Sequence, residues 1–185
     1  GRGLYRPKIC NLGYIPYEIG MGSSAALATS VIRSIYRYFN KEISEEETLD
    51  LVNQTEDQIH GKSSGIDATV VVKQKPVYFE KGKKIMELEM NVDAFLLIAD
   101  TGIKGKTNEA VSDVRDLIEK DKSNYCFIES LGDLARKSRV CIEENKAKEL
   151  GQYMYQAHEY LKKLSVSNDS LDKLVEISRK MGALG

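Results

Sequence analysis

Two glycines, two serines and two alanines stand together in the run G-M-G-S-S-A-A at residues 20–26. Gly20 and Gly22 allow the backbone to turn tightly and to approach a ligand where a Cβ would clash. A helical segment follows, so free N–H groups and the positive end of the helix dipole converge near Ser23 and Ser24, an arrangement that suits phosphate. The alternative is a Gly-Ser turn that only caps a helix. The spacing fits neither a Walker A loop nor a dinucleotide fingerprint.

A carboxylate occupies an apolar position on the next helical segment. Ser44 and Glu47 have the spacing of a capping box, and residues 45–60 carry helical periodicity. Glu56 falls on the same apolar stripe as Val52. A carboxylate in that position must be paired, protonated or bound to a cation, because an isolated buried charge is very costly. A salt bridge to an Arg or Lys and a metal ligand both remain open.

A second glycine loop, H-G-K-S-S-G-I-D-A, follows at residues 60–68. Asp67 comes between this loop and an apolar, β-branched stretch, a placement that suits a carboxylate orienting or deprotonating a hydroxyl. The alternative is that Asp67 is the N-cap of a short helix at 68–71. His60 is interpreted as a partner of the helix C-terminus rather than as a base.

The third segment, residues 95–111, reads F-L-L-I-A-D-T-G-I-K-G-K-T-N-E-A-V. Its pattern predicts a buried strand at 95–99, a glycine-bearing loop with two lysines, and a helix from about Asn108. Groups that act on a ligand commonly lie on loops that leave the carboxyl end of a strand. Thr107 has the ordinary position of an N-cap.

The composition of the 185 residues excludes several classes of protein. The 27 basic and 28 acidic residues give a net charge of −1, so the chain has no electrostatic footprint for nucleic acid or an anionic membrane. No apolar run is long enough to span a bilayer. Three cysteines without metal spacing (Cys10, Cys126 and Cys141) indicate buried free thiols in a reducing cytosol. We therefore expect a cytoplasmic protein.

The coarse pattern predicts an α+β fold of two parts. One or two strands are expected within 5–19, a helix at 24–39, and a hairpin around the turn at 81–84. From Asn108 onward the pattern is helical, with apolar stripes at 150–164 and 171–181 that we expect to form core. The composition shifts near residue 90, so we expect a nucleotide-binding and catalytic domain at 1–90, with a mixed sheet and helices, and a helix-rich domain at 91–185.

The three segments, in this order, resemble those of the kinase superfamily named for galactokinase, homoserine kinase, mevalonate kinase and phosphomevalonate kinase. The His-Gly-x-x-Ser-Gly-x-Asp run is most similar to that of the bacterial mevalonate kinases, and the likeness extends from about Ile15 to the end of the chain. The resemblance implies a two-domain small-molecule-kinase fold and ATP-dependent phosphorylation of the primary hydroxyl of mevalonate, with Mg²⁺, in the mevalonate pathway of isoprenoid biosynthesis.

The resemblance also implies a role for each residue that matches a family motif. Ser24 and Glu56 match positions that hold Mg²⁺, Asp67 matches the catalytic aspartate beside the mevalonate hydroxyl, and Thr107 matches a threonine near the transfer centre. Whether Asp67 acts as a base or orients the hydroxyl stays open. The ATP phosphates would be wrapped by the residues of the first loop: Gly20, Met21, Gly22, Ser23, Ser24 and Ala25.

Several departures from the family pattern set further expectations. The family's Pro-Gly-Lys and Gly-Glu-His segment and its later glycine-rich motif do not occur here, and Ser63 stands where proline is usual. We therefore expect a portion of a longer enzyme that is inactive by itself. A sister kinase acting on another small alcohol and a non-catalytic, helix-rich interaction fragment are the alternatives. The sequence leaves a homodimer open.

Overall fold

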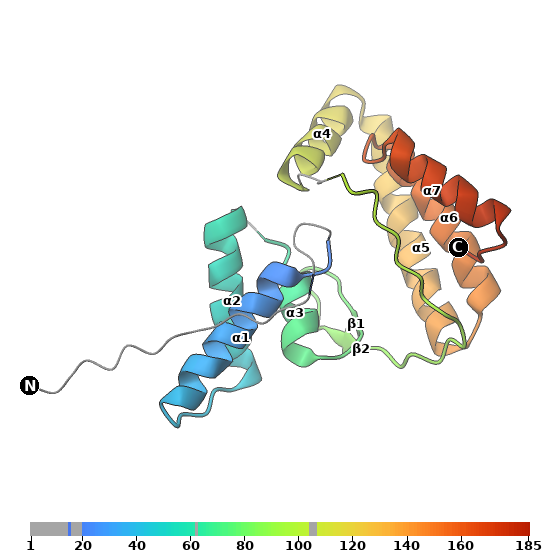
Figure 1. Cartoon of the computed structure of the whole chain (residues 1–185). Helices are drawn as coiled ribbons and strands as arrows, with labels where there is room; N and C mark the ends of the chain where they lie inside the picture. The colour runs from blue at the N-terminus through green and yellow to red at the C-terminus, as the bar shows by residue number, and fades with distance from the viewer. Residues whose placement is uncertain (1–14, 16–19, 62, 104–106) are drawn as a thin grey trace, which may run out of the picture. The chain divides into compact units, whose positions relative to one another are not determined.

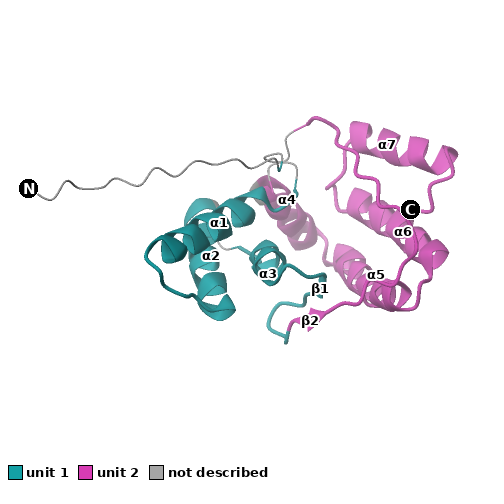
Figure 2. Ribbon diagram, turned by 60° about the horizontal axis from the view of Figure 1, so that its bottom comes forward, with its two compact units in different colours: residues 1–84 teal, residues 85–185 magenta. Residues whose placement is uncertain are grey.

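The computed structural model describes residues 15, 20–61, 63–103 and 107–185. The chain divides into two compact units, Gly1–Lys84 and Ile85–Gly185, each of which is described by itself (Figure 2). The boundary lies a few residues before the junction near residue 90 that the composition suggests. The strands expected within 5–19 lie outside the described residues.

Among its described residues, the first unit contains the helices α1 (Ser23–Tyr38), α2 (Glu45–His60) and α3 (Ile66–Lys73) (Figure 1). The predicted capping box starts α2, because Ser44 Oγ accepts from the Glu47 N–H and the Glu47 carboxylate accepts from the Ser44 N–H. The helices meet through small and β-branched side chains, a choice that lets their backbones approach closely. The buried core consists of Ala25, Val52, Ala68 and Val72.

A short hairpin follows these helices, as the sequence predicts. Strands β1 (Val77–Tyr78) and β2 (Met86–Glu87) pair as a two-stranded sheet. Gly82 lies in the turn at a φ of +81°, which a residue with a Cβ adopts only with strain. The fold is α+β, as expected, but within the described residues the sheet is limited to these two strands.

The second unit is helical. It contains α4 (Thr107–Lys120), the 3₁₀ turn η1 (Lys122–Asn124), α5 (Tyr125–Glu143), α6 (Ala147–Lys163) and α7 (Asp169–Lys180). Leu134, Cys141 and Leu164 are buried between the helices. The apolar stripes are only partly core, because Met154 and Met181 are 47% and 82% exposed. Across the described residues, no helix combines the length and apolar content needed to cross a bilayer.

The predicted buried strand at residues 95–99 is wrong for this structure. The segment is extended but pairs with no strand among the described residues, and Phe95, Leu96, Leu97 and Ile98 are 106, 81, 91 and 61% exposed. A strand that is buried on both faces needs neighbours along its edges and layers above and below it. The apolar sequence is typical of such a strand, but the described part of the chain does not contain the neighbours that would bury it.

Candidate phosphate and metal site

The glycine-serine loop presents unpaired backbone donors at the start of α1. Gly20 and Gly22 have left-handed backbones, with φ of +74° and +64°, and Gly22 caps α1 without any side-chain hydrogen bond. The Ala26 N–H donates to the Gly22 carbonyl at 3.0 Å, which closes the first turn. The N–H groups ahead of it have no intrahelical acceptor, and no acidic side chain lies in the first turn. The loop is therefore suited to receive an anion.

The hydroxyl of Ser24 and the carboxylate of Glu56 are in direct contact. Ser24 Oγ donates to Glu56 Oε1 at 2.6 Å, although Glu56 is only 7% exposed. Within the described residues no Lys or Arg pairs with Glu56, so the salt-bridge interpretation is wrong there. A hydroxyl gives the buried carboxylate a hydrogen bond without neutralising its charge. The charge is thus available to a cation.

The spacing of these two oxygens fits a shared divalent cation. Mg²⁺ binds oxygen ligands at about 2.1 Å in an octahedron, which puts adjacent ligand atoms about 3 Å apart. The observed 2.6 Å needs only a small widening once the hydroxyl proton turns away. The described residues contain no cluster of three or more His, Cys, Asp or Glu side chains that could hold a metal. A cation bound here would therefore need further ligands from water or phosphate.

Asp67 lies against the glycine-serine loop. A Cβ built on Gly22 would lie 3.8 Å from Asp67 Cβ and 3.9 Å from its Cγ. Asp67 is not an N-cap, because α3 begins at Ile66 and its cap is Gly65, at a φ of +81°. The carboxylate instead occupies the first turn of α3, with an exposed side chain. The Asp67 carboxylate therefore lies beside the loop that is suited to an anion.

The other candidate residues are placed differently. Ala25 has no exposed surface and packs in the core, so its contribution to the loop is packing. Met21 is 44% exposed at the rim of the loop. Thr107 is the first residue of α4, in the second unit, and is not an N-cap preceding it. Lys104 and Lys106 lie outside the described residues, as does the side chain of His60.

Sequence reasoning missed two residues of α2 that lie beside the loop before Asp67, of which Asp57 bonds to it. Asp57 Oδ1 accepts from the Ser63 N–H at 2.7 Å. Asn53 Oδ1 is buried without a hydrogen-bond partner, 3.6 Å from where a Cβ of Gly65 would lie. Asn53 lies three residues before Glu56 and so shares its face of the helix, which is the signal that could have found it, whereas the spacing of Asp57 from Glu56 gives no such signal.

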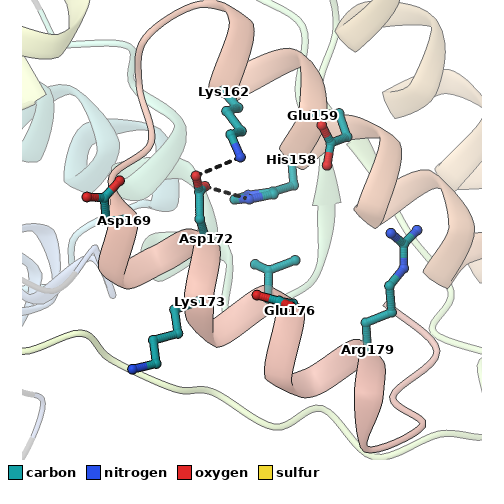
Figure 3. A pocket seen from close by; sticks show the side chains of 9 residues that line it. His158, Glu159, Lys162, Asp169, Asp172, Lys173, Glu176 and Arg179 are labelled. Atoms are coloured by element: carbon teal, nitrogen blue, oxygen red, sulfur yellow. Dashed lines mark hydrogen bonds and ion pairs between the residues drawn. The ribbon is translucent and has the colours of Figure 1, made fainter.

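A charged groove of about 520 Å³ lies between α6 and α7 in the second unit (Figure 3). Its central carboxylate is fully engaged, since Asp172 pairs with Lys162 Nζ at 2.8 Å and with His158 Nε2 at 3.0 Å. Asp172 also accepts from Ser167 Oγ at 2.7 Å. These bonds lower the pKa of Asp172, with the Lys162 bond as the largest cause. The cluster around Asp172 therefore joins α6 to α7, and the Asp172 carboxylate is already bonded within the protein.

The first unit thus presents a glycine-serine loop at a helix N-terminus, with a hydroxyl–carboxylate pair and a second carboxylate beside it, an arrangement suited to a phosphate and a divalent cation. The comparison with known proteins agrees, because residues 9–75 match the family described as GHMP kinases N terminal domain. The sequence relatives are mevalonate kinases. That of Thermococcus sibiricus is 37% identical over 177 residues, and that of Pyrococcus furiosus is 34% identical over 188 residues.

Solved structures of mevalonate kinases share the fold. The Leishmania major enzyme, solved in complex with R-mevalonate, aligns with a TM-score of 0.75 at 23% identity, over 89% of this chain and 52% of that one. The Methanococcus jannaschii enzyme aligns with a TM-score of 0.70 at 27% identity, over 91% and 53%. The sequence resemblance is thereby confirmed.

The alignments cover nearly all of this chain but only about half of each relative. The chain spans about half the length of the curated relatives it matches: 92% of this chain aligns with 53% of the T. sibiricus relative, and 96% with 54% of the P. furiosus relative. The activity of a complete protein is therefore a proposal, which is argued from the site.

Proposed function

We propose that this chain is part of an ATP-dependent mevalonate kinase that phosphorylates the primary hydroxyl of mevalonate. The contact between Ser24 and Glu56, next to the glycine loop and Asp67, is the observation that carries the proposal. It is supported by the resemblance to mevalonate kinases over nearly the whole chain. R-mevalonate is the molecule named in the Leishmania major structure.

Phosphoryl transfer needs alignment of the reacting groups and positive charge near the phosphoryl oxygens rather than covalent chemistry by the protein. The N–H groups at the start of α1 would bind the ATP phosphates, with Gly20 and Gly22 shaping the loop. Ser24 and Glu56 are the residues that would hold Mg²⁺. The ion, when bound, supplies charge that neutralises the phosphate oxygens.

Asp67 would orient the mevalonate hydroxyl or accept its proton. The side chain of Asp67 on α3 is exposed and that of Glu56 on α2 is buried, so the two carboxylates have different surroundings. Two carboxylates in one site raise the pKa of one of them, which would impair either role. Thr107 is proposed to lie near the transfer centre in the complete protein, on the basis of the resemblance alone.

The proposal is tested with protein expressed from its complete reading frame. ATP consumption is measured with R-mevalonate, galactose and homoserine as separate acceptors, and we expect turnover with mevalonate. Asp67→Asn is expected to lower kcat by at least about 100-fold with little change in ATP affinity, as for other groups that assist proton transfer. Asp50→Asn is the matched control, because that carboxylate is exposed on α2 and binds Gln54.

A metal titration separates the role of Glu56 from a purely structural one. Glu56→Gln keeps an acceptor for Ser24 but loses the charge, so the Mg²⁺ concentration needed for half-maximal activity should rise by about 10-fold or more. Glu46→Gln, an exposed first-turn residue of the same helix, should leave it unchanged. In the acceptor screen, preference for an alcohol other than mevalonate would favour a sister kinase. Failure of the complete protein to bind nucleotide would favour an interaction fragment.

The proposal also includes a cytoplasmic location and leaves a homodimer as a possible assembly to be tested. Cys126 and Cys141 are free thiols, which supports a reducing compartment; Cys141 is buried as predicted, but Cys126 is exposed, so the prediction of burial is wrong for Cys126. Sedimentation of the same preparation reads the oligomeric state.

A further inference from the structure

The loop between α2 and α3 is bonded to α2 through a side chain that the proposed function does not use. Asp57 Oδ1, in the last turn of α2, accepts a hydrogen bond from the Ser63 N–H at 2.7 Å, six positions further along the chain. Asp57 directly follows Glu56, so the end of α2 carries both the proposed metal ligand and this contact. The bond therefore fixes the start of the loop to the helix that holds Glu56.

The other end of the loop is tied into α3. Gly65 caps this helix at a φ of +81°, and its carbonyl accepts from the Thr69 N–H at 3.1 Å and from Thr69 Oγ1 at 2.7 Å. Thr69 is itself buried, with 2% of its surface exposed. Asp67 lies in this first turn of α3, four residues after Ser63. The position of Asp67 therefore depends on where the loop delivers the start of α3.

α2 also lies directly against the capping residue of α3. Asn53 Oδ1 is buried 3.6 Å from where a Cβ of Gly65 would lie. Asn53 and Glu56 are three residues apart and share a face of α2. Movement of the loop away from α2 would therefore change the spacing between Glu56 and Asp67, the two carboxylates that the proposed transfer requires.

We infer that Asp57 is a positioning residue for Asp67, because its hydrogen bond to the Ser63 N–H holds the loop at the spacing from Glu56 that transfer to the mevalonate hydroxyl needs. This role deepens the proposed function and rests on it. The bond is exposed to water, so its net contribution to the stability of the fold is modest. Position matters more, since a displacement of about 1 Å in a reacting group can lower a rate by about 100-fold.

The bond depends on the residue at position 63. Ser63 stands where the family pattern has proline, and a proline has no N–H to donate. In this chain the side chain of Asp57 takes over a restraint that a proline ring would impose on the backbone. Substitution of Ser63 therefore provides a direct test of how Asp57 acts.

Steady-state kinetics of protein expressed from its complete reading frame, with R-mevalonate and Mg·ATP, measure the effect. Asp57→Ala removes the acceptor and should lower kcat by about 10-fold or more, with the KM for ATP within about twofold of the parent value. Asp57→Asn keeps an acceptor oxygen and should retain kcat within about threefold. A purely structural role would lower the unfolding midpoint in urea and leave the kcat of the folded enzyme unchanged. Asp50→Ala is the matched control, because Asp50 is exposed on the same helix and binds Gln54 within it.

A double-mutant cycle with Ser63→Pro identifies the bond itself. Once the N–H is absent, Asp57→Ala should change kcat by less than about twofold, whatever the kcat of Ser63→Pro alone. A full further loss in the Ser63→Pro background would show that Asp57 acts by another route. Equal losses in Asp57→Asn and Asp57→Ala would show that the charge acts instead of the bond. Either result would overturn the inference, and the second comparison decides the matter if Ser63→Pro does not fold.

The same measurements keep this role apart from the proposed function. A folded parent protein that turns over none of the acceptors would refute the proposed function and the positioning role together. An active parent protein whose kcat is unchanged by Asp57→Ala would refute the positioning role alone.

Discussion

Ser24 Oγ donates a 2.6 Å hydrogen bond to Glu56 Oε1, a residue that lies 32 positions further along the chain. The bond joins the start of α1 to the buried face of α2, and its acceptor is a carboxylate oxygen. Hydrogen bonds to charged groups contribute about 1.5–3 kcal/mol to stability, and a buried group that loses its partner costs at least as much. The contact is therefore part of the fold of the first unit as well as of the proposed metal site.

Removal of the donor is expected to destabilise the first unit more than neutralisation of the acceptor. Ser24→Ala leaves the Glu56 carboxylate buried without a hydrogen bond and should lower the free energy of unfolding by about 1–3 kcal/mol. Glu56→Gln keeps an oxygen for the Ser24 hydroxyl and should cost less. Urea denaturation of the 185-residue chain measures both changes.

Ser30→Ala serves as the control for the helix. Ser30 lies on α1 and its hydroxyl donates only to the Ala26 carbonyl within the helix, in an exposed position. The change should stay within about 0.5 kcal/mol. If Ser24→Ala were as mild as Ser30→Ala, the bond to Glu56 would contribute nothing to the fold.

How far the sequence anticipates this structure depends on how local each signal is. The capping box at Ser44 and the turn at Gly82 are decided by residues a few positions apart, and both predictions are confirmed. The proximity of Ser24 and Glu56 is not local. It is expected only because family motifs place both residues at one cation, and the structure brings them together.

The failures concern burial, which depends on distant neighbours. The pattern at 95–99 predicts a buried strand, but the layers that would bury it are not among the described residues. Helical spacing predicts Met181 in the core, yet it lies just beyond α7 and is 82% exposed. The roles of Asn53 and Asp57 depend on a loop up to about a dozen residues away, whose path the sequence does not specify.

Gly22 should be essential to the site rather than to the fold alone. Its φ of +64° strains any residue with a Cβ, so Gly22→Ala should cost about 1–2 kcal/mol of stability. The added methyl would also lie 3.8 Å from Asp67 Cβ, in the space between the loop and that carboxylate. Isothermal titration of the complete protein with Mg·ATP should show affinity reduced by about tenfold or more, equivalent to about 1.4 kcal/mol.

Gly82→Ala isolates the strain from the site. Gly82 has a φ of +81° in the hairpin, and nothing lies within 4 Å of the position that a Cβ would take, so the backbone cost is similar and no ligand group is nearby. Its affinity for Mg·ATP should be unchanged. Equal loss of affinity in the two variants would assign the effect to stability instead of to the loop.

Gly151 should be required for residues 183–185, which we call the tail, to dock on α6. A Cβ at this position would overlap the Leu184 carbonyl oxygen, a backbone atom that can move only if the tail moves. The tail is otherwise held by the Tyr155 hydroxyl, which donates to the Ala183 carbonyl at 3.0 Å. Gly151→Ala should therefore release residues 183–185, seen as faster hydrogen exchange and limited proteolysis near the C-terminus.

Gly132→Ala is the matched control for Gly151. Gly132 lies inside α5, and the nearest atom to its Cβ position is the flexible end of Arg136, 3.7 Å away. Replacement by alanine should stabilise the helix by about 0.5–1 kcal/mol and leave the tail protected. Protection of the tail in Gly151→Ala would show that close backbone approach does not govern docking.

Asp172 should make the attachment of α7 to α6 depend on pH on the acid side. The bonds from Lys162 and Ser167 lower the pKa of Asp172 below its ordinary value of 3.8, to which it returns when the chain unfolds. A lowered native pKa contributes stability that is complete above the ordinary value and is lost as the pH falls through the native value. Asp172→Asn should thus lower the urea midpoint of the chain at neutral pH, and the gap from the parent protein should close well below pH 3.8.

Glu176→Gln is the control, because the Glu176 carboxylate pairs with Lys180 on the same exposed helix face and that bond joins no two elements. It should give a smaller gap at neutral pH. A gap for Asp172→Asn that persists unchanged into acid would mean that the neutral amide is a poor fit in the cluster and that the charge does not hold the helices together.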